Sequence, residues 1–396
     1  MKKYDITVFG ATGFTGELTI NYLASKVKDK PFKIAIAGRD YSKLNFMKKR
    51  IMAKFPECKD VGVVIADVTS YNSLLEMALA SKIVITTVGP YLKYGEDVVK
   101  ACIEGKADYL DLTGEGGFVD TIIKRYHEKA KQEKVRILNC CGFDSIPADL
   151  GTFFTVSKLP PNEPKEVECF VTVTSSIPSA MSQWNSVSGG TWHSAIGFMN
   201  FSEYLRQKES YSRIASSSIS RKIFPIPFQM RYRNETGTFG APLPFVDIEV
   251  VLRSAAALES YGPEFSYGHY AGIGSILTLV GGAFAVGTIF ALAQLEITKN
   301  WLLSIKKPGD GPDEIQRQSN SFCLSFVGKS KSKTVRTEVR GGDPGYGDTA
   351  KILSEAALTL LHDPIPETYG VVTPATILGE NLIKRLDSIG VTFREV

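Results

Sequence analysis

The amino-acid sequence predicts an α/β protein: a doubly wound parallel sheet, with a second α+β domain that contains a mostly antiparallel sheet. Three observations predict this fold class. A glycine-rich turn at residues 10–16 follows an apolar run, short apolar runs then alternate with helical segments up to residue 146, and this pattern stops after Pro147. The chain has 396 residues, more than the roughly 250–300 at which a single core stops growing, so two domains are expected.

The alternation in the first part of the chain indicates parallel strands covered by helices, because strands buried on both faces read as continuous apolar runs. The candidate strands are residues 6–9, 33–37, 61–66, 83–88, 109–112 and 135–140. Helical spacing of apolar residues lies between them, at 15–26, 41–54, 70–80, 95–105 and 118–132. Six strands in this alternation predict a Rossmann-type sheet.

A proline-rich stretch at residues 160–164 marks the expected domain boundary, because proline continues neither a helix nor a central strand. The second domain, 156–345, is expected to hold a sheet, and the Ser-rich residues 210–220 are expected to form a mobile surface loop. Its candidate strands are residues 166–174, 244–253, 321–328 and 333–340. The C-terminal segment shows helical spacing at 348–361 and 376–388. We expect this segment to return to the first domain, which then comprises residues 1–155 plus about 346–396.

Composition excludes several classes of protein. With 43% hydrophobic and 22% charged residues the chain is expected to fold, and its net charge of +4 is spread along the whole length. No concentrated basic region is therefore predicted for nucleic acid. The six cysteines form no CxxC pair or metal-ligand spacing, and no apolar signal segment follows Met1. These features predict no metal site, free thiols and a cytoplasmic location.

The glycine-rich turn predicts a dinucleotide site. The pyrophosphate of a dinucleotide needs backbone N–H donors, which the start of a helix after a strand supplies. Gly10 permits the tight turn, Gly13 lets the backbone approach the phosphates, and Gly16 lets helix and strand pack closely. The predicted cofactor-binding residues here are Gly10, Ala11, Thr12, Gly13, Phe14, Thr15 and Gly16. Their spacing is GxxGxxG, as in short-chain and related reductases, rather than GxGxxG.

The end of the second strand predicts NADP(H) rather than NAD. Arg39 directly follows the strand and can bind a 2′-phosphate with a bidentate fork. Asp40, the next residue, keeps NAD open, since an acid at this place can bind the ribose 2′-hydroxyl instead. Asp67 ends the third strand and is expected either to accept from the adenine amino group or to cap the following helix.

The ends of the later strands supply the candidate catalytic groups. Val88, Gly89, Pro90 and Tyr91 end the fourth strand, where the nicotinamide ribose is expected. Tyr91 is the first candidate for a proton or oxyanion donor, with packing on the cofactor as the alternative. Asp144 is the second candidate, with helix capping as its alternative. Further polar groups at the strand ends are Tyr94, Tyr109, Asp111 and Ser145.

Two glycine-rich segments lie later in the chain. Ser188, Gly189, Gly190 and Thr191 could present backbone N–H groups to a substrate carbonyl or anion, or form an ordinary helix cap. The segment 341–347 is expected to be a tight crossover between domains or a substrate lid.

Residues 270–295 carry no charged side chain. About 20 apolar residues suffice to cross a bilayer, but five glycines and the position inside the second domain argue against a span. A hairpin on a membrane or lipid-droplet surface, the wall of a lipid-binding site, and a buried core or homodimer helix remain open.

Several motifs resemble one family. GATGFTG, AGRD, TTVGPY, YLDLTGE and CGFDSIPADLG follow one another along residues 10–151, and EVRGGDPGYGDTAK and GVVTPATILGENLIKRL lie near the C-terminus. This combination is similar to the saccharopine dehydrogenase-like oxidoreductases, in the branch with the trans-acting enoyl reductases. The resemblance implies an NADP-binding Rossmann domain, a second α+β domain and, in the enoyl reductases, reduction of a carbon–carbon double bond in a lipid precursor.

Together these features predict an NADP(H)-dependent oxidoreductase that reduces an enoyl or carbonyl group of a lipid-like substrate. A saccharopine-type C–N oxidoreductase is one alternative, although it would require several basic residues around a charged substrate. A non-catalytic NADP-binding protein associated with a membrane or lipid droplet is the other.

Overall fold

The computed structural model describes residues 2–175, 201–217, 221–234, 237–243, 245–273, 287–305 and 314–396. The chain divides into two compact units. The first unit comprises Met1–Phe143 and Tyr346–Leu382, and the second comprises Asp144–Gly345 and Ile383–Val396.

A seven-stranded parallel sheet organises the first unit, in the order β14-β6-β5-β4-β1-β2-β3. Its strands are β1 (Tyr4–Phe9), β2 (Ile34–Gly38), β3 (Gly62–Ile65), β4 (Ser81–Thr86), β5 (Asp108–Leu110), β6 (Arg136–Leu138) and β14 (Gly370–Val372). The six predicted strands are confirmed, and β14 adds a seventh beside β6. The order reverses between β4 and β1, which is where doubly wound sheets bind their ligands.

Helices connect these strands, as the apolar spacing predicts. They are α1 (Phe14–Lys26), α2 (Tyr41–Lys54), α3 (Tyr71–Ala80), α4 (Tyr91–Gly105) and α5 (Gly116–Gln132), with α14 (Gly347–His362) and α15 (Pro374–Ile377) from the C-terminal segment. α14 packs along α1 although more than 300 residues separate them. The Tyr22 hydroxyl donates to Glu355 across this contact at 2.7 Å.

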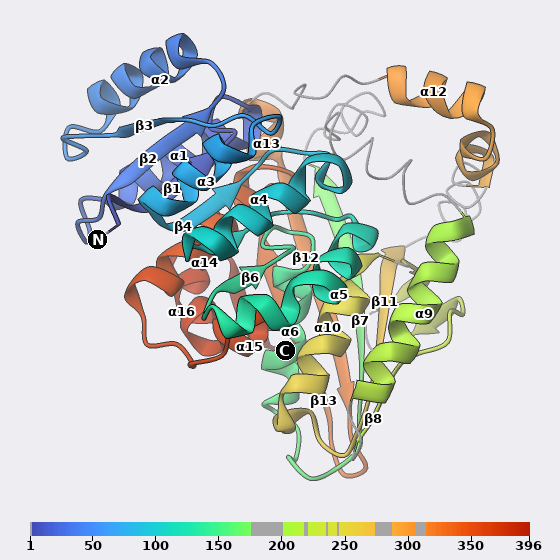
Figure 1. Ribbon diagram of the computed structural model, residues 1–396. Coiled ribbons are helices and arrows are strands. Elements are labelled where there is room, and N and C mark those ends of the chain that lie inside the picture. Colours follow the sequence, from blue (N-terminus) through green and yellow to red (C-terminus); the bar gives the residue numbers. More distant parts are fainter. Residues whose placement is uncertain are drawn as a thin grey trace. The chain divides into compact units, whose positions relative to one another are not determined.

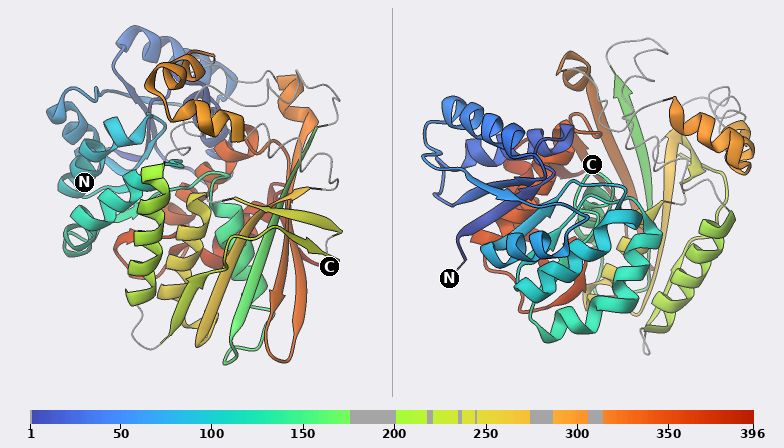
Figure 2. Two further views of the ribbon diagram at one scale, coloured as in Figure 1. Left: turned by 90° about the vertical axis from the view of Figure 1, so that its right-hand side faces the viewer. Right: turned by 45° about the horizontal axis from the view of Figure 1, so that its top comes forward.

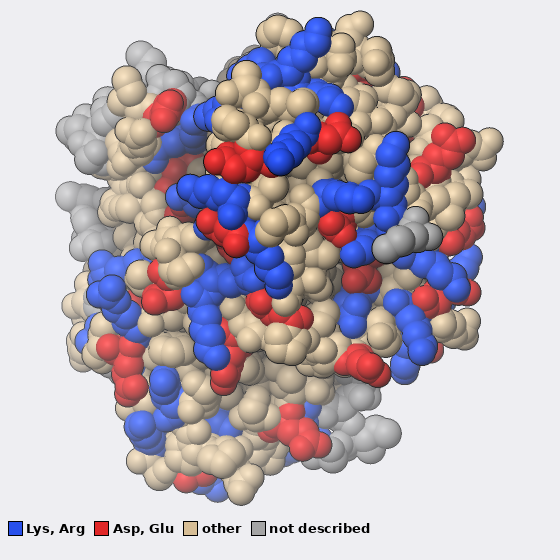
Figure 3. Space-filling model, turned by 90° about the vertical axis from the view of Figure 1, so that its left-hand side faces the viewer, with Lys and Arg blue, Asp and Glu red and all other residues tan. Residues whose placement is uncertain are grey.

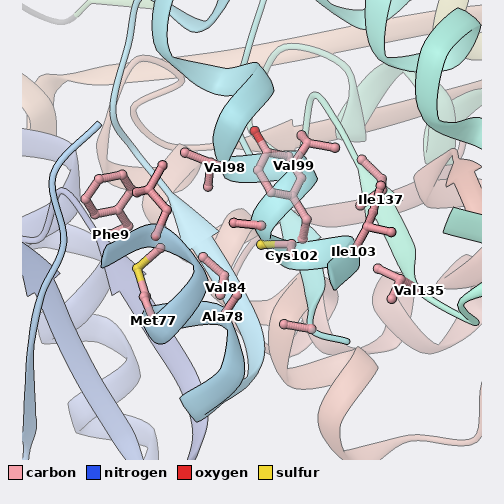
Figure 4. Close-up of a cluster of buried hydrophobic side chains, with 14 of the residues drawn as sticks. Phe9, Met77, Ala78, Val84, Val98, Val99, Cys102, Ile103, Val135 and Ile137 are labelled. Atoms are coloured by element: carbon pink, nitrogen blue, oxygen red, sulfur yellow. The ribbon is translucent and has the colours of Figure 1, made fainter. Parts of the chain in front are cut away.

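A hydrophobic core fixes the helices to the sheet (Figure 4). Phe9, Met77 and Val84 meet Val98 and Ile137 there, and each of these side chains is almost entirely buried. Burying such a side chain contributes about 1.5–3 kcal/mol. This core holds the carboxyl ends of the strands in place for the site described below.

The second unit contains a mixed sheet in the order β15-β13-β12-β7-β11-β10-β9, with β8 paired to β11 (Figure 2). The strands are β7 (Lys165–Ser175), β8 (Lys222–Pro225), β9 (Arg231–Arg233), β10 (Thr238–Pro242), β11 (Glu264–Ile273), β12 (Asn320–Lys329), β13 (Thr334–Gly341) and β15 (Thr392–Glu395). β7 and β8 lie parallel to β11, and the other pairs are antiparallel.

The helices of the second unit include α6 (Ile146–Val156), α9 (Phe201–Ser217), α10 (Val246–Ala257), α12 (Glu296–Ser304) and α13 (Glu314–Ser319), with the short helix η1 at Glu259–Tyr261. α6 packs on β12 and β13, and α10 packs on α6 and β11. Near the C-terminus, α16 spans Gly379–Ser388.

Two predictions for the second domain were wrong. Residues 244–253 were expected to form a strand, but residues 246–253 belong to α10, and the missing central strand is β11. Residues 210–217, expected to be a loop, belong to α9. Both helices are stabilised by one distant contact, because Arg206 and Ser210 of α9 bind the buried carboxylate of Glu249 in α10. Local sequence patterns carry no information about such a partner.

The domain boundaries also differ from the predicted ones. The first unit ends at Phe143 rather than at residue 155, because α6 packs with the sheet of the second unit. The C-terminal segment is divided between the two units, since β14 pairs with β6 whereas β15 pairs with β13.

The uncharged run 270–295 lies only partly within the described residues. Tyr270–Ile273 end strand β11, and residues 287–293 are helical. Among the described residues, no helix combines the length and the apolar character that a membrane span requires.

Charges of both signs are mixed on the face drawn in Figure 3, where Lys and Arg alternate with Asp and Glu. This face therefore presents no continuous basic surface of the kind that binds nucleic acid.

Candidate functional site

The glycine-rich turn lies between β1 and α1, at the carboxyl edge of the parallel sheet. Gly10 has a φ of +82°, a conformation that side chains other than glycine rarely adopt. Its N–H donates to the Ala37 carbonyl of β2 at 3.0 Å. A Cβ atom at Gly16 would lie 2.2 Å from the Gly10 carbonyl oxygen. The turn therefore takes its shape only with glycine at both positions, which is the cradle a pyrophosphate needs.

The start of α1 has no side-chain cap. The first N–H groups of a helix have no partner within the helix, and Gly13, which precedes α1, supplies no side-chain cap. The start of α4 is different, because the Glu115 carboxylate accepts from the N–H groups of Tyr91 and Leu92, both at 2.9 Å. A carboxylate of the protein thus already binds the start of α4, whereas Gly13 has no side chain that could cap α1.

The Glu115 carboxylate stabilises α4, and replacing it tests this role. We expect Glu115→Ala to lower the free energy of unfolding by about 1–2 kcal/mol, because two N–H groups lose their acceptor and the helix dipole loses a charge. Glu115→Gln should lose less, and Glu128→Ala on the exposed face of α5 should be close to neutral. Urea denaturation measures all three variants, and equal losses in the three would contradict the cap.

Arg39 and Asp40, the two residues after β2, differ in their contacts. Asp40 caps α2, since its carboxylate accepts from the Lys43 N–H at 3.0 Å. Arg39 is exposed and lies near Asp67. Hydrogen bonds from the N–H and hydroxyl of Thr69 lower the pKa of Asp67, and the charge of Arg39 lowers it further. The Asp67 carboxylate thus forms a local turn with Thr69. The residue directly before α3 is Ser70, so Asp67 is not the N-cap of that helix.

Tyr91 points into the core of the first unit. Its side chain is 6% exposed, its hydroxyl donates to the Thr86 carbonyl at 3.1 Å, and its ring packs on Phe118. Burial and the nearby carboxylate of Asp111 raise its pKa well above the ordinary value. This placement disfavours the predicted role as a proton donor, because that role needs a hydroxyl that a substrate can reach. Val88, Gly89 and Pro90 connect β4 to α4 as expected.

Asp111, at the end of β5, organises the loop after β6. Its buried carboxylate accepts from the Tyr109 hydroxyl at 2.8 Å and from Asn139 Nδ2 at 2.6 Å. It also accepts from the N–H of Thr113 at 3.1 Å and the N–H of Cys140 at 2.9 Å. These hydrogen bonds lower the pKa of Asp111, but burial raises it by more, to about 6. The loop is thereby held at the carboxyl edge of the sheet.

The end of this loop is held by α14. The Phe143 N–H donates to the Thr349 hydroxyl at 3.1 Å, and Tyr346, just before α14, packs edge-on against Phe14 of the glycine-rich turn. Tyr346 belongs to the glycine-rich segment 341–347, which joins β13 to α14. Local sequence patterns cannot predict these contacts, since the partners lie more than 200 residues apart.

The other predicted residues are distributed as follows. Asp144 is exposed and begins the second unit, and Ser145 precedes α6 without capping it. Ser188, Gly189, Gly190 and Thr191 lie outside the described residues. Within the part of the chain that the structure describes, no group of His, Cys, Asp or Glu is arranged to hold a metal ion.

The doubly wound sheet and the glycine-rich turn place this chain among the dinucleotide-binding oxidoreductases. Residues 6–138 match the family described as saccharopine dehydrogenase NADP binding domain. The chain belongs to the saccharopine dehydrogenase-like oxidoreductase family. It is 32% identical to the Homo sapiens protein of that name over an alignment of 423 residues. This alignment covers 99% of this chain and 97% of that protein.

Two further comparisons place the chain more widely. It is 30% identical to the trans-acting enoyl reductase of Mycobacterium ulcerans over 412 residues, covering 98% of this chain and 97% of that protein. A solved saccharopine dehydrogenase (L-Glu forming) from Saccharomyces cerevisiae has a TM-score of 0.55 and 12% identity, covering 99% and 100% of the two chains. At this identity the likeness concerns the fold alone.

Proposed function

We propose that this protein uses NADPH to reduce the enoyl or carbonyl group of a lipid-like substrate. The observation that carries the cofactor choice is the pair of residues after β2. The Asp40 carboxylate is engaged as the cap of α2, whereas the exposed Arg39 guanidinium is open to a 2′-phosphate. The full-length likeness to a trans-acting enoyl reductase supports the reaction class. The uncharged run 270–295 supports an apolar substrate.

The residues that would hold NADPH fit its shape. The backbone of Gly10–Gly16 and the start of α1 would bind the pyrophosphate, and Arg39 would bind the 2′-phosphate. Bound NADPH supplies a hydride to the substrate. The protein then has to position the substrate, exclude water and provide a proton.

Replacing Arg39 tests the cofactor choice. We expect Arg39→Ala to weaken NADPH binding about 30-fold, which corresponds to about 2 kcal/mol, and to change NADH binding about twofold at most. Fluorescence titration with each cofactor measures both constants. Arg125→Ala, which removes a surface arginine paired with Glu96, is the matched control. Equal losses for NADPH and NADH would rule out the 2′-phosphate assignment.

The reaction class is tested on purified protein by following NADPH absorbance with three groups of substrates. These are enoyl thioesters of short and long chain, ketones and aldehydes of matched chain length, and a keto acid mixed with an amino acid. Preferred oxidation of NADPH by the long-chain enoyl thioesters is expected. Reaction only with the keto acid mixture would favour a C–N oxidoreductase, and tight NADPH binding without oxidation would favour a non-catalytic protein.

A further inference from the structure

Thr87 is the first residue after β4, and it contacts the glycine-rich turn that follows β1. The two strands are neighbours in the parallel sheet (Figure 1), where Phe9 pairs with Thr86. The Thr87 N–H donates to the Phe9 carbonyl at 3.0 Å, which extends this pairing past the end of β4. The backbone of Thr87 therefore lies directly beside the start of the turn.

The Thr87 hydroxyl reaches two carbonyl groups at this place. It lies 3.2 Å from the Phe9 carbonyl oxygen and 3.3 Å from the Gly10 carbonyl oxygen, so its one proton is shared between the two acceptors. The Gly10 oxygen also accepts from the Gly13 N–H at 2.9 Å, which closes the turn. The Gly10 carbonyl group thus receives one donor from within the turn and one donor from the end of β4.

The side of Gly10 that lacks a side chain faces the end of β4. A Cβ atom at Gly10 would lie 2.7 Å from Val88 Cγ2 and 2.9 Å from Thr87 Oγ1. Non-bonded heavy atoms are in favourable contact at about 3.5–4.0 Å, so these two side chains already occupy the space beside Gly10. Thr87 and Val88 therefore form a wall against which the backbone of the turn packs.

The orientation of the Gly10 carbonyl group matters for an anion bound at this turn. In a trans peptide the carbonyl oxygen and the next N–H point in opposite directions. The partial negative charge of a carbonyl oxygen repels a phosphate, whereas N–H groups attract it. The two donors on the Gly10 oxygen therefore oppose a rotation of this carbonyl group toward the phosphates.

Thr87 also connects two parts of the expected cofactor site. Doubly wound sheets bind their ligands where the strand order reverses, and this reversal lies between β4 and β1. The pyrophosphate is expected at the turn after β1, and the nicotinamide ribose is expected after β4. Thr87 is partly exposed and bridges these two strand ends through its hydrogen bonds.

We propose that Thr87 is a positioning residue for NADPH. Its hydroxyl fixes the Gly10 carbonyl group and thereby holds the N–H groups of the glycine-rich turn in the orientation that binds the pyrophosphate. This inference rests on the proposed use of NADPH. Because Thr87 acts through the turn, its loss weakens the binding of the pyrophosphate and leaves the contact between Arg39 and the 2′-phosphate intact.

The first test replaces the Thr87 hydroxyl by a methyl group of similar volume. We expect Thr87→Val to weaken NADPH binding about tenfold, because the Gly10 carbonyl oxygen loses the donor from β4. Thr87→Ser keeps the hydroxyl and should bind NADPH within about twofold of the wild type. Thr121→Val is the matched control, since the Thr121 hydroxyl is also partly buried and donates to the Gly117 carbonyl of α5 at 2.9 Å. Fluorescence titration with NADPH measures all four proteins.

The second test uses adenosine 2′-monophosphate and separates a local effect from a general loss of stability. This nucleotide carries the 2′-phosphate but no pyrophosphate. It should therefore bind Thr87→Val as it binds the wild type, whereas Arg39→Ala should bind it more weakly. Titration followed by nuclear magnetic resonance measures this binding. Hydrogen exchange at the Gly13 amide, measured without nucleotide, should be faster in Thr87→Val than in the wild type.

Equal NADPH binding by Thr87→Val and the wild type would overturn the inference. Equal losses in Thr87→Val and Thr87→Ser would do the same, because the hydroxyl would then not be the group that matters. A parallel loss of adenosine 2′-monophosphate binding in Thr87→Val would assign the effect to the stability of the whole unit and would also overturn it. A wild-type protein that binds neither NADPH nor the 2′-monophosphate would instead overturn the proposed function, and with it the role of Thr87.

Discussion

Gly16→Ala should weaken NADPH binding about 100-fold, or about 3 kcal/mol, and should also lower the stability of the first unit. The added Cβ would lie 2.2 Å from the Gly10 carbonyl oxygen and 2.9 Å from Ala11 Cα, and both neighbours are backbone atoms that cannot rotate away. α1 must therefore move outward. Its first N–H groups then leave the position in which they would bind the pyrophosphate.

Two other glycines provide graded controls for this prediction. A Cβ at Gly13 would lie 3.3 Å from the same carbonyl oxygen, so Gly13→Ala should have a smaller effect. A Cβ at Gly287 meets nothing within 4 Å, so Gly287→Ala should leave NADPH binding unchanged. Isothermal titration with NADPH measures the three variants. A Gly16→Ala protein that binds NADPH like the wild type would show that the turn is not the phosphate site.

Asp111→Ala should lower the free energy of unfolding by about 3–5 kcal/mol, because four donors around one buried carboxylate lose their acceptor. The loop from Asn139 to Phe143 should loosen, which hydrogen exchange at the Cys140 amide would detect. Asp111→Asn should lose less, since its remaining oxygen can still accept from the N–H groups of Thr113 and Cys140. Equal losses in the two variants would contradict this expectation, because Asn keeps the volume and one acceptor oxygen of the side chain and would then retain none of its stabilising effect.

The pH dependence of stability gives a separate test of Asp111. Its pKa in the folded protein is about 6, above the ordinary value of 3.8, so the folded state binds the proton more tightly than the unfolded state. The stability of the wild type relative to Asp111→Asn should therefore be greatest below about pH 4 and should fall as pH rises to about 6. Urea unfolding across this range measures the difference. A rise over the same range would mean that the hydrogen bonds outweigh burial.

Local sequence patterns were sufficient for most of the first unit. Continuous apolar runs identified β1 to β6, and apolar residues at helical spacing identified α1 to α5. The patterns failed where partners were distant. Residues 246–250 alternate apolar and acidic side chains, which is typical of a strand, yet they form a helix in which the buried Glu249 is paired with Arg206 of α9. β14 and β15 are short strands that are recognisable only from the sheets they join.

In the candidate site, too, local sequence patterns predict some features, whereas others depend on distant partners. The order of glycines at residues 10–16 and the arginine after β2 are local features, since backbone conformation and the charge of the next residue depend on a few consecutive positions. The direction of a side chain is not local. Tyr91 follows β4 as expected, but its hydroxyl turns into the core because Thr86 offers an acceptor and Phe118 a packing surface there.

The amino-acid sequence alone determined that this protein has a doubly wound parallel sheet with a glycine-rich turn, because both follow from residue spacing over short stretches. The tertiary structure decided which polar groups meet. It brought Glu115 to the start of α4, Asp111 to the loop after β6, and Thr349 to the N–H of Phe143. Each of these contacts depends on the folding of distant segments into one core, and the resulting burial and charge set the chemistry of the side chains.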